Sequence, residues 1–150
     1  MKKFIKILCL FVILTSCEYE PIFSTKKTGF SISNIEVINQ NNLTKQIIRS
    51  LKEFQNNDNE RVLSLEIKTE KIKEVTAKDS KGNTKSFRSK IICDFKIFKN
   101  DRLIKSKEII ENFSYNNDSD KFKLRKYESN IEKILVNRII ENIILELYSL

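Results

Sequence analysis

The sequence predicts an α+β fold, a two-layer sandwich in which two helices cover one face of a four-stranded mixed sheet. Several runs rich in β-branched residues alternate apolar and polar side chains, which is typical of half-buried strands. Two other stretches repeat apolar residues at helical spacing, one after the first strand and one at the C-terminal end. The resulting order, β-α-β-β-β-α, favours a meander of three strands covered by helices on one face.

The first strand and the first helix are expected before residue 55. Residues 30–38 (FSISNIEVI) are rich in β-branched side chains and predict a strand. A polar break over 39–42 precedes a predicted helix over 43–54, whose apolar positions form one stripe. These positions are Leu43, Ile47, Ile48, Leu51 and Phe54. We expect the first strand to join the next one through a right-handed crossover that contains this helix.

Three strands of a meander are predicted to follow. Their ranges are 61–76, 84–98 and 102–115. Turn residues separate them, Gly82-Asn83 in the first connection and Asn100-Asp101 in the second. In the first of these strands the apolar register slips at Ile72 and Val75, which predicts a bulge or fraying there.

A long helix is predicted from Lys121 onward, since neither Gly nor Pro interrupts the apolar periodicity. Asp118 and Ser119 are candidates for its N-cap. Its second half is apolar on more than one face, through Ile139, Ile140, Ile143, Ile144, Leu145, Leu147 and Leu150. We favour burial of these residues against the sheet and the first helix, because soluble chains rarely expose such patches. The alternative is that part of this surface contacts a partner.

Residues 1–16 have the composition of an export signal, with a basic head, an uncharged apolar stretch and small residues before Cys17. The stretch is too short to span a bilayer, which takes about 20 apolar residues. Leu14-Thr15-Ser16-Cys17 resembles a bacterial lipobox, which implies cleavage before Cys17, a diacylglycerol on its thiol and an acyl group on its amine. The alternative is a simple secretory signal, with Cys17 an ordinary thiol.

These features divide the chain into three parts. We expect a lipoprotein signal peptide over 1–16, a lipidated tether over 17–28 and a single sandwich domain over 29–150. Two or more acyl chains anchor a protein stably where one is marginal. A domain of this kind can therefore remain at a membrane surface without a transmembrane helix.

The composition argues against catalysis. The chain contains no His, which removes the commonest general base and metal ligand. Two Gly residues are too few for a Gly-rich phosphate loop. Cys93 lies on the apolar side of a predicted strand, where we expect it to behave as a small hydrophobe and to form no disulfide. We expect no enzymatic activity, no metal and no cofactor other than the lipid on Cys17.

The basic charge points to anionic lipid in preference to nucleic acid. Without the three lysines of residues 1–16, the 28 basic residues fall to 25 against 20 acidic ones. Lys and Glu are interspersed, so no nucleic-acid-binding arm stands out. Lipid or lipopolysaccharide phosphates are the more natural counter-charges for an exported protein at a membrane.

One basic cluster is a candidate ligand site. Lys85, Arg88 and Lys90 lie near one end of the predicted third strand, and Lys78 and Lys81 occupy the turn before it. We expect these side chains on the solvent-facing side, where they could bind lipopolysaccharide phosphates. The simpler alternative is a solvated sheet face in a lysine-rich chain.

The segment that follows the lipobox carries a family resemblance. Cys17, Tyr19, Pro21, Ile22 and Phe23 resemble the mature start of the LptE family of lipopolysaccharide-assembly lipoproteins, in its alphaproteobacterial form. Glu18 departs from that pattern, in which Gly is usual. The string Asn112-Phe113-Ser114-Tyr115-Asn116 resembles the Ser-Tyr-Asn stretch that leads to the C-terminal helix of the family.

The resemblance spans the mature chain and implies an α/β sandwich without catalytic activity. Members of the LptE family lodge in the lumen of LptD, a large outer-membrane barrel, help it assemble and help deliver lipopolysaccharide to the cell surface. The resemblance implies an outer-membrane location, facing the periplasm. The main alternative is another outer-membrane assembly or lipid-transport lipoprotein with a different partner. An inner-membrane lipoprotein is a third option, less favoured because Glu18 is not the Asp associated with retention there.

Overall fold

The protein is described by a computed structural model over residues 29–55, 59 and 61–150. The predicted signal peptide, Cys17 and the tether fall outside the described residues. The elements are β1 (Ser31–Val37), α2 (Asn42–Leu51), the 3-10 helix η2 (Lys52–Phe54), β2 (Val62–Lys78), β3 (Thr84–Lys99), β4 (Arg102–Asn116) and α3 (Lys121–Tyr148). This order confirms the predicted β-α-β-β-β-α arrangement.

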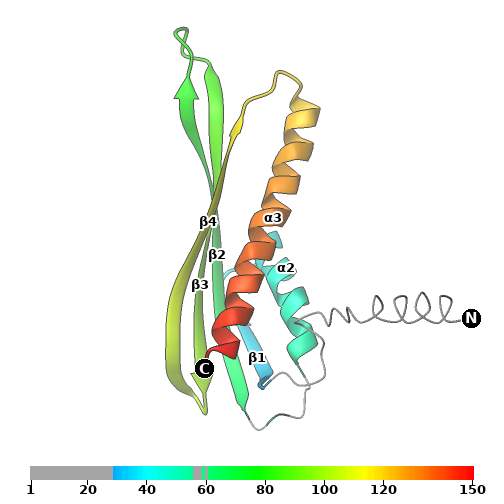
Figure 1. Cartoon of the computed structure of the whole chain (residues 1–150), viewed down its shortest axis with the longest axis vertical. Helices are drawn as coiled ribbons and strands as arrows, with labels where there is room; N and C mark the ends of the chain where they lie inside the picture. The colour runs from blue at the N-terminus through cyan, green and yellow to red at the C-terminus, as the bar shows by residue number, and fades with distance from the viewer. Residues whose placement is uncertain (1–28, 56–58, 60) are drawn as a thin grey trace, which may run out of the picture.

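The four strands form one mixed sheet in the order β1-β2-β3-β4. β1 runs parallel to β2, and β2, β3 and β4 are antiparallel neighbours. Both helices cover the same face of the sheet, and the other face is open (Figure 1). The predicted two-layer sandwich is therefore confirmed.

Alternation along the strands builds the core. Leu63, Leu65 and Ile67 of β2 point to the helices, and so do Ile91, Cys93, Phe95 and Ile97 of β3, each at most 1 % exposed. From α3 the core receives Ile131, Leu135, Val136, Ile139, Ile140, Ile143, Ile144 and Leu147. The predicted burial of the C-terminal half of this helix is thus confirmed for Ile139, Ile140, Ile143, Ile144 and Leu147, whereas Leu145 and Leu150 remain 59 % and 41 % exposed.

Charged side chains hold α3 along both flanks of the sheet. On the β2 side, Glu132 pairs with Lys71 and Glu128 with Lys73. On the β4 side, the ion pairs are Glu146 with Lys105 and Lys107, and Arg138 with Glu111. Within the described residues no helix is sufficiently long and apolar to cross a membrane.

These ion pairs explain the slip in the apolar register of β2. Ile72 pairs with Lys90 on the open face, while its neighbours Lys71 and Lys73 occupy the positions that face α3. The strand is regular here, so the prediction of a bulge at Ile72 is wrong. The register does shift between Val75 and Ala77, so the predicted irregularity at Val75 is confirmed, and β2 continues to Lys78.

The ends of the helices are fixed by side-chain caps. Asn41 accepts from the backbone N–H groups of Leu43 and Thr44, and Thr44 accepts from that of Asn41, which forms a capping box at α2. Asp120 caps α3 by accepting from the N–H groups of Phe122 and Lys123, in place of the predicted Asp118 or Ser119.

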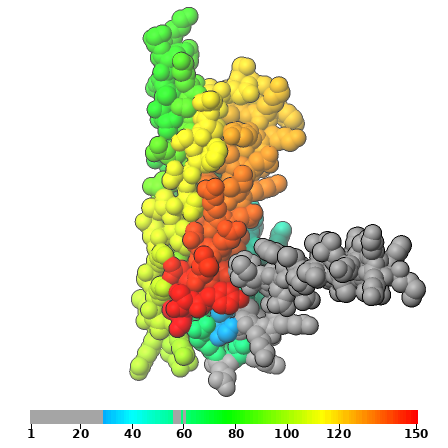
Figure 2. Space-filling model, in the orientation of Figure 1, coloured from blue at the N-terminus to red at the C-terminus, as the bar shows by residue number. Residues whose placement is uncertain are grey.

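The elongated molecule has two distinct ends. The described chain begins beside the C-terminus of α3, where the ring of Phe30 lies 5.2 Å from that of Tyr148. We call this the proximal end. The β2–β3 hairpin and the start of α3 form the opposite, distal end (Figures 1 and 2). The 28 residues of α3 make the separation about 42 Å.

Candidate functional site

The distal end carries the excess positive charge of the protein. Its two segments, 70–90 and 111–138, contain 13 basic and eight acidic residues. These segments therefore carry a net charge of +5. The whole chain after residue 16 carries the same net charge, with 25 basic and 20 acidic residues. The part of the chain nearest the start of the described domain is therefore balanced in charge, and the far end is basic.

The three predicted ligand residues do not share one face. Arg88 and Lys90 lie on the open face of the sheet, where they pair with Glu74 and Ile72 of β2. Alternation along β3 directs Lys85 to the opposite face, the side of Phe87. The expectation of a single solvent-facing cluster is thus corrected: two cations face one way and the third faces the other.

Arg88 already has a partner on the open face. Its Nε donates to Oγ of Ser114, at 3.3 Å, and Ser114 is its cross-strand neighbour on β4. Lys85 and Lys90 make no ion pair with any other described residue. These two lysines therefore remain available to an anion.

The hairpin that carries Lys78 and Lys81 is organised by Asp79. Its carboxylate accepts from the side-chain amide of Asn83 and from the backbone N–H groups of Asn83 and Lys81. These hydrogen bonds, led by the one from the Asn83 side chain, lower the pKa of Asp79. Gly82 has φ of 85°, in the left-handed region that glycine adopts readily. The tip is thus a defined turn that presents lysine side chains to solvent.

A polar and aromatic cluster joins the hairpin to α3. Tyr115 Oη donates to Glu128 at 2.8 Å, and the same carboxylate accepts from Lys73 Nζ at 2.6 Å. The Lys73 ammonium lies 3.9 Å from the ring centre of Phe87, and that ring lies 5.7 Å from Tyr115. This cluster fixes the first turns of α3 against β2, β3 and β4.

The cluster shifts the pKa values of its members. Burial raises the pKa of Tyr115, and its hydrogen bond to the carboxylate of Glu128 adds to the effect. Burial alone would raise the pKa of Glu128, but the hydrogen bonds from Lys73 and Tyr115 outweigh it and the net pKa is lowered. At the other end of α3, hydrogen bonds from Lys105 and Lys107 lower the pKa of Glu146.

We expect these two carboxylates to make stability fall in acid. A carboxyl whose folded pKa is depressed stabilises the fold above its unfolded pKa, about 4.3, and this is lost as pH falls through the folded value. The double variant E128Q/E146Q should therefore be less stable at pH 6 by up to about 2 kcal/mol and show a flatter decline below pH 5. Urea unfolding between pH 6 and pH 3 measures both. An unchanged decline in the variant would contradict this assignment.

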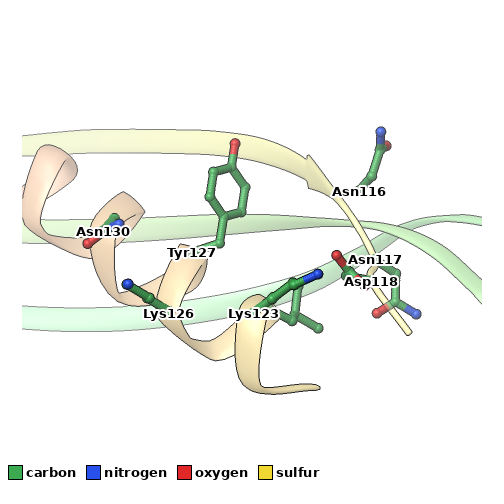
Figure 3. A pocket seen from close by; sticks show the side chains of 8 residues that line it. Asn116, Asn117, Asp118, Lys123, Lys126, Tyr127 and Asn130 are labelled. Carbon is green, nitrogen blue, oxygen red and sulfur yellow. The ribbon is translucent and has the colours of Figure 1, made fainter. Parts of the chain in front are cut away.

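A cleft of about 500 Å³ lies where β4 passes into α3. Its walls are Asn116, Asn117 and Asp118 from the connection and Lys123, Leu124, Lys126, Tyr127 and Asn130 from the helix (Figure 3). Asn117 is fixed there because its Nδ2 donates to the carbonyl oxygen of Thr84, at 2.8 Å. Its Oδ1 is buried and finds no partner among the described residues. Amides, a half-exposed phenol, two ammonium groups and the carboxylate of Asp118 line the cleft beside the apolar Leu124, so its net charge is positive.

The cations of α3 were not singled out from the sequence. Lys121, Lys123, Arg125 and Lys126 lie in its first two turns, where the helix dipole favours acidic residues. This departure from the usual charge pattern is the signal that could have identified the distal end. Repulsion among these cations decreases when an anion binds near them.

The described residues offer no catalytic constellation. Cys93 is buried, and burial raises the pKa of its thiol to about 12, so it is held as a neutral thiol at physiological pH. No group of three or more Cys, Asp or Glu side chains in the described ranges is arranged to hold a metal ion.

Comparisons with known proteins identify relatives by fold. No family model and no curated protein matches the sequence. Rare lipoprotein B from Shewanella oneidensis is similar with a TM-score of 0.63 and 13 % identity, over 79 % of this chain and 94 % of that one. A minor lipoprotein from Acinetobacter baumannii is similar with a TM-score of 0.61 and 13 % identity, over 79 % of this chain and 91 % of that one. Lipoprotein B from Nitrosomonas europaea has a TM-score of 0.61 and 11 % identity, over 77 % of this chain and 80 % of that one.

These identities are too low to carry more than the architecture. The chain therefore shares its fold with several bacterial lipoproteins, along most of the length of each.

Proposed function

We propose that this protein is an outer-membrane lipoprotein that lodges in the LptD barrel, helps it assemble and assists delivery of lipopolysaccharide to the cell surface. The observation that carries the proposal is the likeness in fold to bacterial lipoproteins over 77–79 % of the chain. The lipobox before Cys17 and the Tyr-x-Pro-Ile-Phe string after it support the same conclusion.

The shape of the domain suits this role. The described domain begins at the proximal end, so a lipid on Cys17 would hold that end at the membrane, while the basic distal end extends about 42 Å away. A protein that works by docking needs a rigid body, and α3 is fixed along both flanks by ion pairs. The role requires neither a nucleophile nor a metal.

Affinity purification from membranes in mild detergent tests the choice of partner. The tagged full-length protein should recover a large β-barrel of the LptD type in stoichiometric amount. A variant with Cys17 replaced by serine is the control for membrane attachment. Recovery of a different outer-membrane assembly or lipid-transport complex would replace this proposal with the alternative accessory lipoprotein, and recovery of no barrel would refute it.

We propose that Lys85, Arg88 and Lys90 bind lipopolysaccharide phosphates, Arg88 and Lys90 on the open face of the sheet and Lys85 on the opposite face. Their triple reversal to glutamate should weaken binding of lipopolysaccharide by the purified protein at least about tenfold, because one lost charged hydrogen bond costs about 1.5 kcal/mol. Surface plasmon resonance on immobilised lipopolysaccharide measures the change. The matched control is the triple reversal of Lys45 and Arg49 on α2 and Lys52 on η2, which changes the net charge equally and lies away from the β2–β3 hairpin. Equal loss in both variants would remove the assignment.

A further inference from the structure

A groove runs between α2 and α3, which lie side by side over the sheet (Figure 1). Ile140 and Ile144 of α3 form its apolar floor. Its rim consists of Ser50 of α2, Glu53 of η2, and Asn137 and Glu141 of α3. The groove has a volume of about 290 Å³, below the roughly 300–1,000 Å³ of most small-molecule pockets. It therefore suits the side chains of a peptide segment better than a cofactor.

The groove lies close to the first residues of the described domain. Phe30 stacks on Phe54, with 5.5 Å between the ring centroids, and Phe54 directly follows Glu53 of the rim. On the other side, Phe30 contacts Tyr148, which lies one turn beyond Ile144 of the floor. The segment that precedes the described domain thus starts at one end of this groove.

That preceding segment carries apolar side chains at a matching distance. Residues 24–28 are polar, and the nearest apolar side chains before them are those of Ile22 and Phe23. Six residue steps separate Phe23 from Gly29 and span up to about 20 Å when extended. The floor of the groove lies within about 12 Å of Tyr148 along α3. Phe23 can therefore reach the floor, with several ångströms of chain to spare.

The charges of the segment and of the groove are complementary. Lys26 and Lys27 lie between Phe23 and the described domain, so a docked segment would carry them past the rim. Glu53 and Glu141 of that rim form no ion pair with any other described residue. Two carboxylates would thus meet two ammonium groups on either side of the apolar contact.

We propose that Pro21-Ile22-Phe23 docks in the groove between α2 and α3, with the ring of Phe23 on its apolar floor. Pro21 restricts its own φ angle and the conformation of Glu20, which lowers the entropy cost of ordering the segment. With a lipid on Cys17, docking would shorten the free chain between anchor and domain from about 40 Å to about 13 Å. The proximal end would then be held against the bilayer in one orientation. The docking itself rests on the groove, the reach and the charges, and does not depend on the proposed function.

Disulfide trapping in the full-length protein, purified in mild detergent, tests the docking. The variant S24C/S50C places one thiol beside Phe23 and one on the rim of the groove. Under mild oxidation it should form an intrachain disulfide at least about tenfold faster than S24C/S149C, because docking raises the effective concentration of the two thiols. Ser149 is a matched control, since it follows Tyr148 at the same end of the molecule but lies toward Lys105 of β4. Mass spectrometry of tryptic peptides identifies the linked pair.

A second pair of variants separates docking from random encounter. Adding F23A to S24C/S50C should reduce the rate of disulfide formation to that of the control pair, whereas adding Y19A should leave it unchanged. Phe23 and Tyr19 both lie outside the described domain, so neither change removes a contact from its core. Equal rates in the two cysteine pairs, an unchanged rate with F23A, or a disulfide between two copies of the chain would each overturn the proposal.

Discussion

Replacement of Cys17 by serine is expected to abolish acylation and to leave the signal peptide uncleaved. The lipobox enzymes act on a thiol that carries diacylglycerol, and a hydroxyl cannot replace it in that thioether. Each acyl methylene contributes about 0.8 kcal/mol to membrane attachment, so loss of the lipid removes the stable anchor. Labelling with radioactive palmitate and fractionation of membranes measure the two effects.

The matched control for this experiment is C93A. Cys93 is buried in the core and is the free cysteine of the described residues. Its replacement should leave palmitate labelling unchanged, which shows that the label is attached elsewhere. Full labelling of the C17S variant would refute the assignment of a lipoprotein and, with it, the geometry proposed for the domain at the membrane.

Truncation of Phe95 is expected to have the largest effect on folding. This ring is 1 % exposed and lies on the helix-facing side of β3, in the hydrophobic core. Phe95→Ala removes a large apolar side chain and leaves a cavity, which costs about 3–5 kcal/mol. Since domains of this size are stable by about 5–15 kcal/mol, this is a large part of the total free energy of unfolding. Urea denaturation followed by circular dichroism measures it.

Phe122→Ala provides the comparison. The same change is made in the first turn of α3, at a ring that is 69 % exposed, and should alter stability by less than about 0.5 kcal/mol. If the two variants lost stability equally, the placement of Phe95 in the core would be wrong.

Much of the fold could be predicted because its periodic signals are local. Alternation in β2 and β3 and helical spacing in α2 and α3 arise from which residues the sheet and helices bury. The Asn100-Asp101 turn also follows from local chemistry, since both residues have left-handed φ angles, 49° and 60°. The prediction of a bulge was wrong at Ile72. The strand is regular there, and Lys71 and Lys73 on either side of Ile72 face α3. Their role becomes apparent only when Glu128 and Glu132 lie opposite them.

The candidate site was predicted less well than the fold. Lys85, Arg88 and Lys90 are close in sequence, but residues an odd number apart on a strand point to opposite faces. The cleft combines the β4–α3 connection with the helix that follows, and Asn117 is fixed by the carbonyl oxygen of Thr84, 33 residues earlier. Such long-range contacts have no signature in a local pattern.

The sequence by itself determined the order of the elements and the apolar face of most of them, because each of these is a property of neighbouring residues. Only the tertiary structure decided that the basic charge collects at the end farthest from the start of the described domain, that acidic residues of α3 satisfy the lysines of β2 and β4, and that β4 is left with a free edge. The physical reason is that charge pairing and edge exposure depend on which distant segments meet. An apolar face, in contrast, is buried by whichever element packs on it, so its position can be read from the local pattern alone.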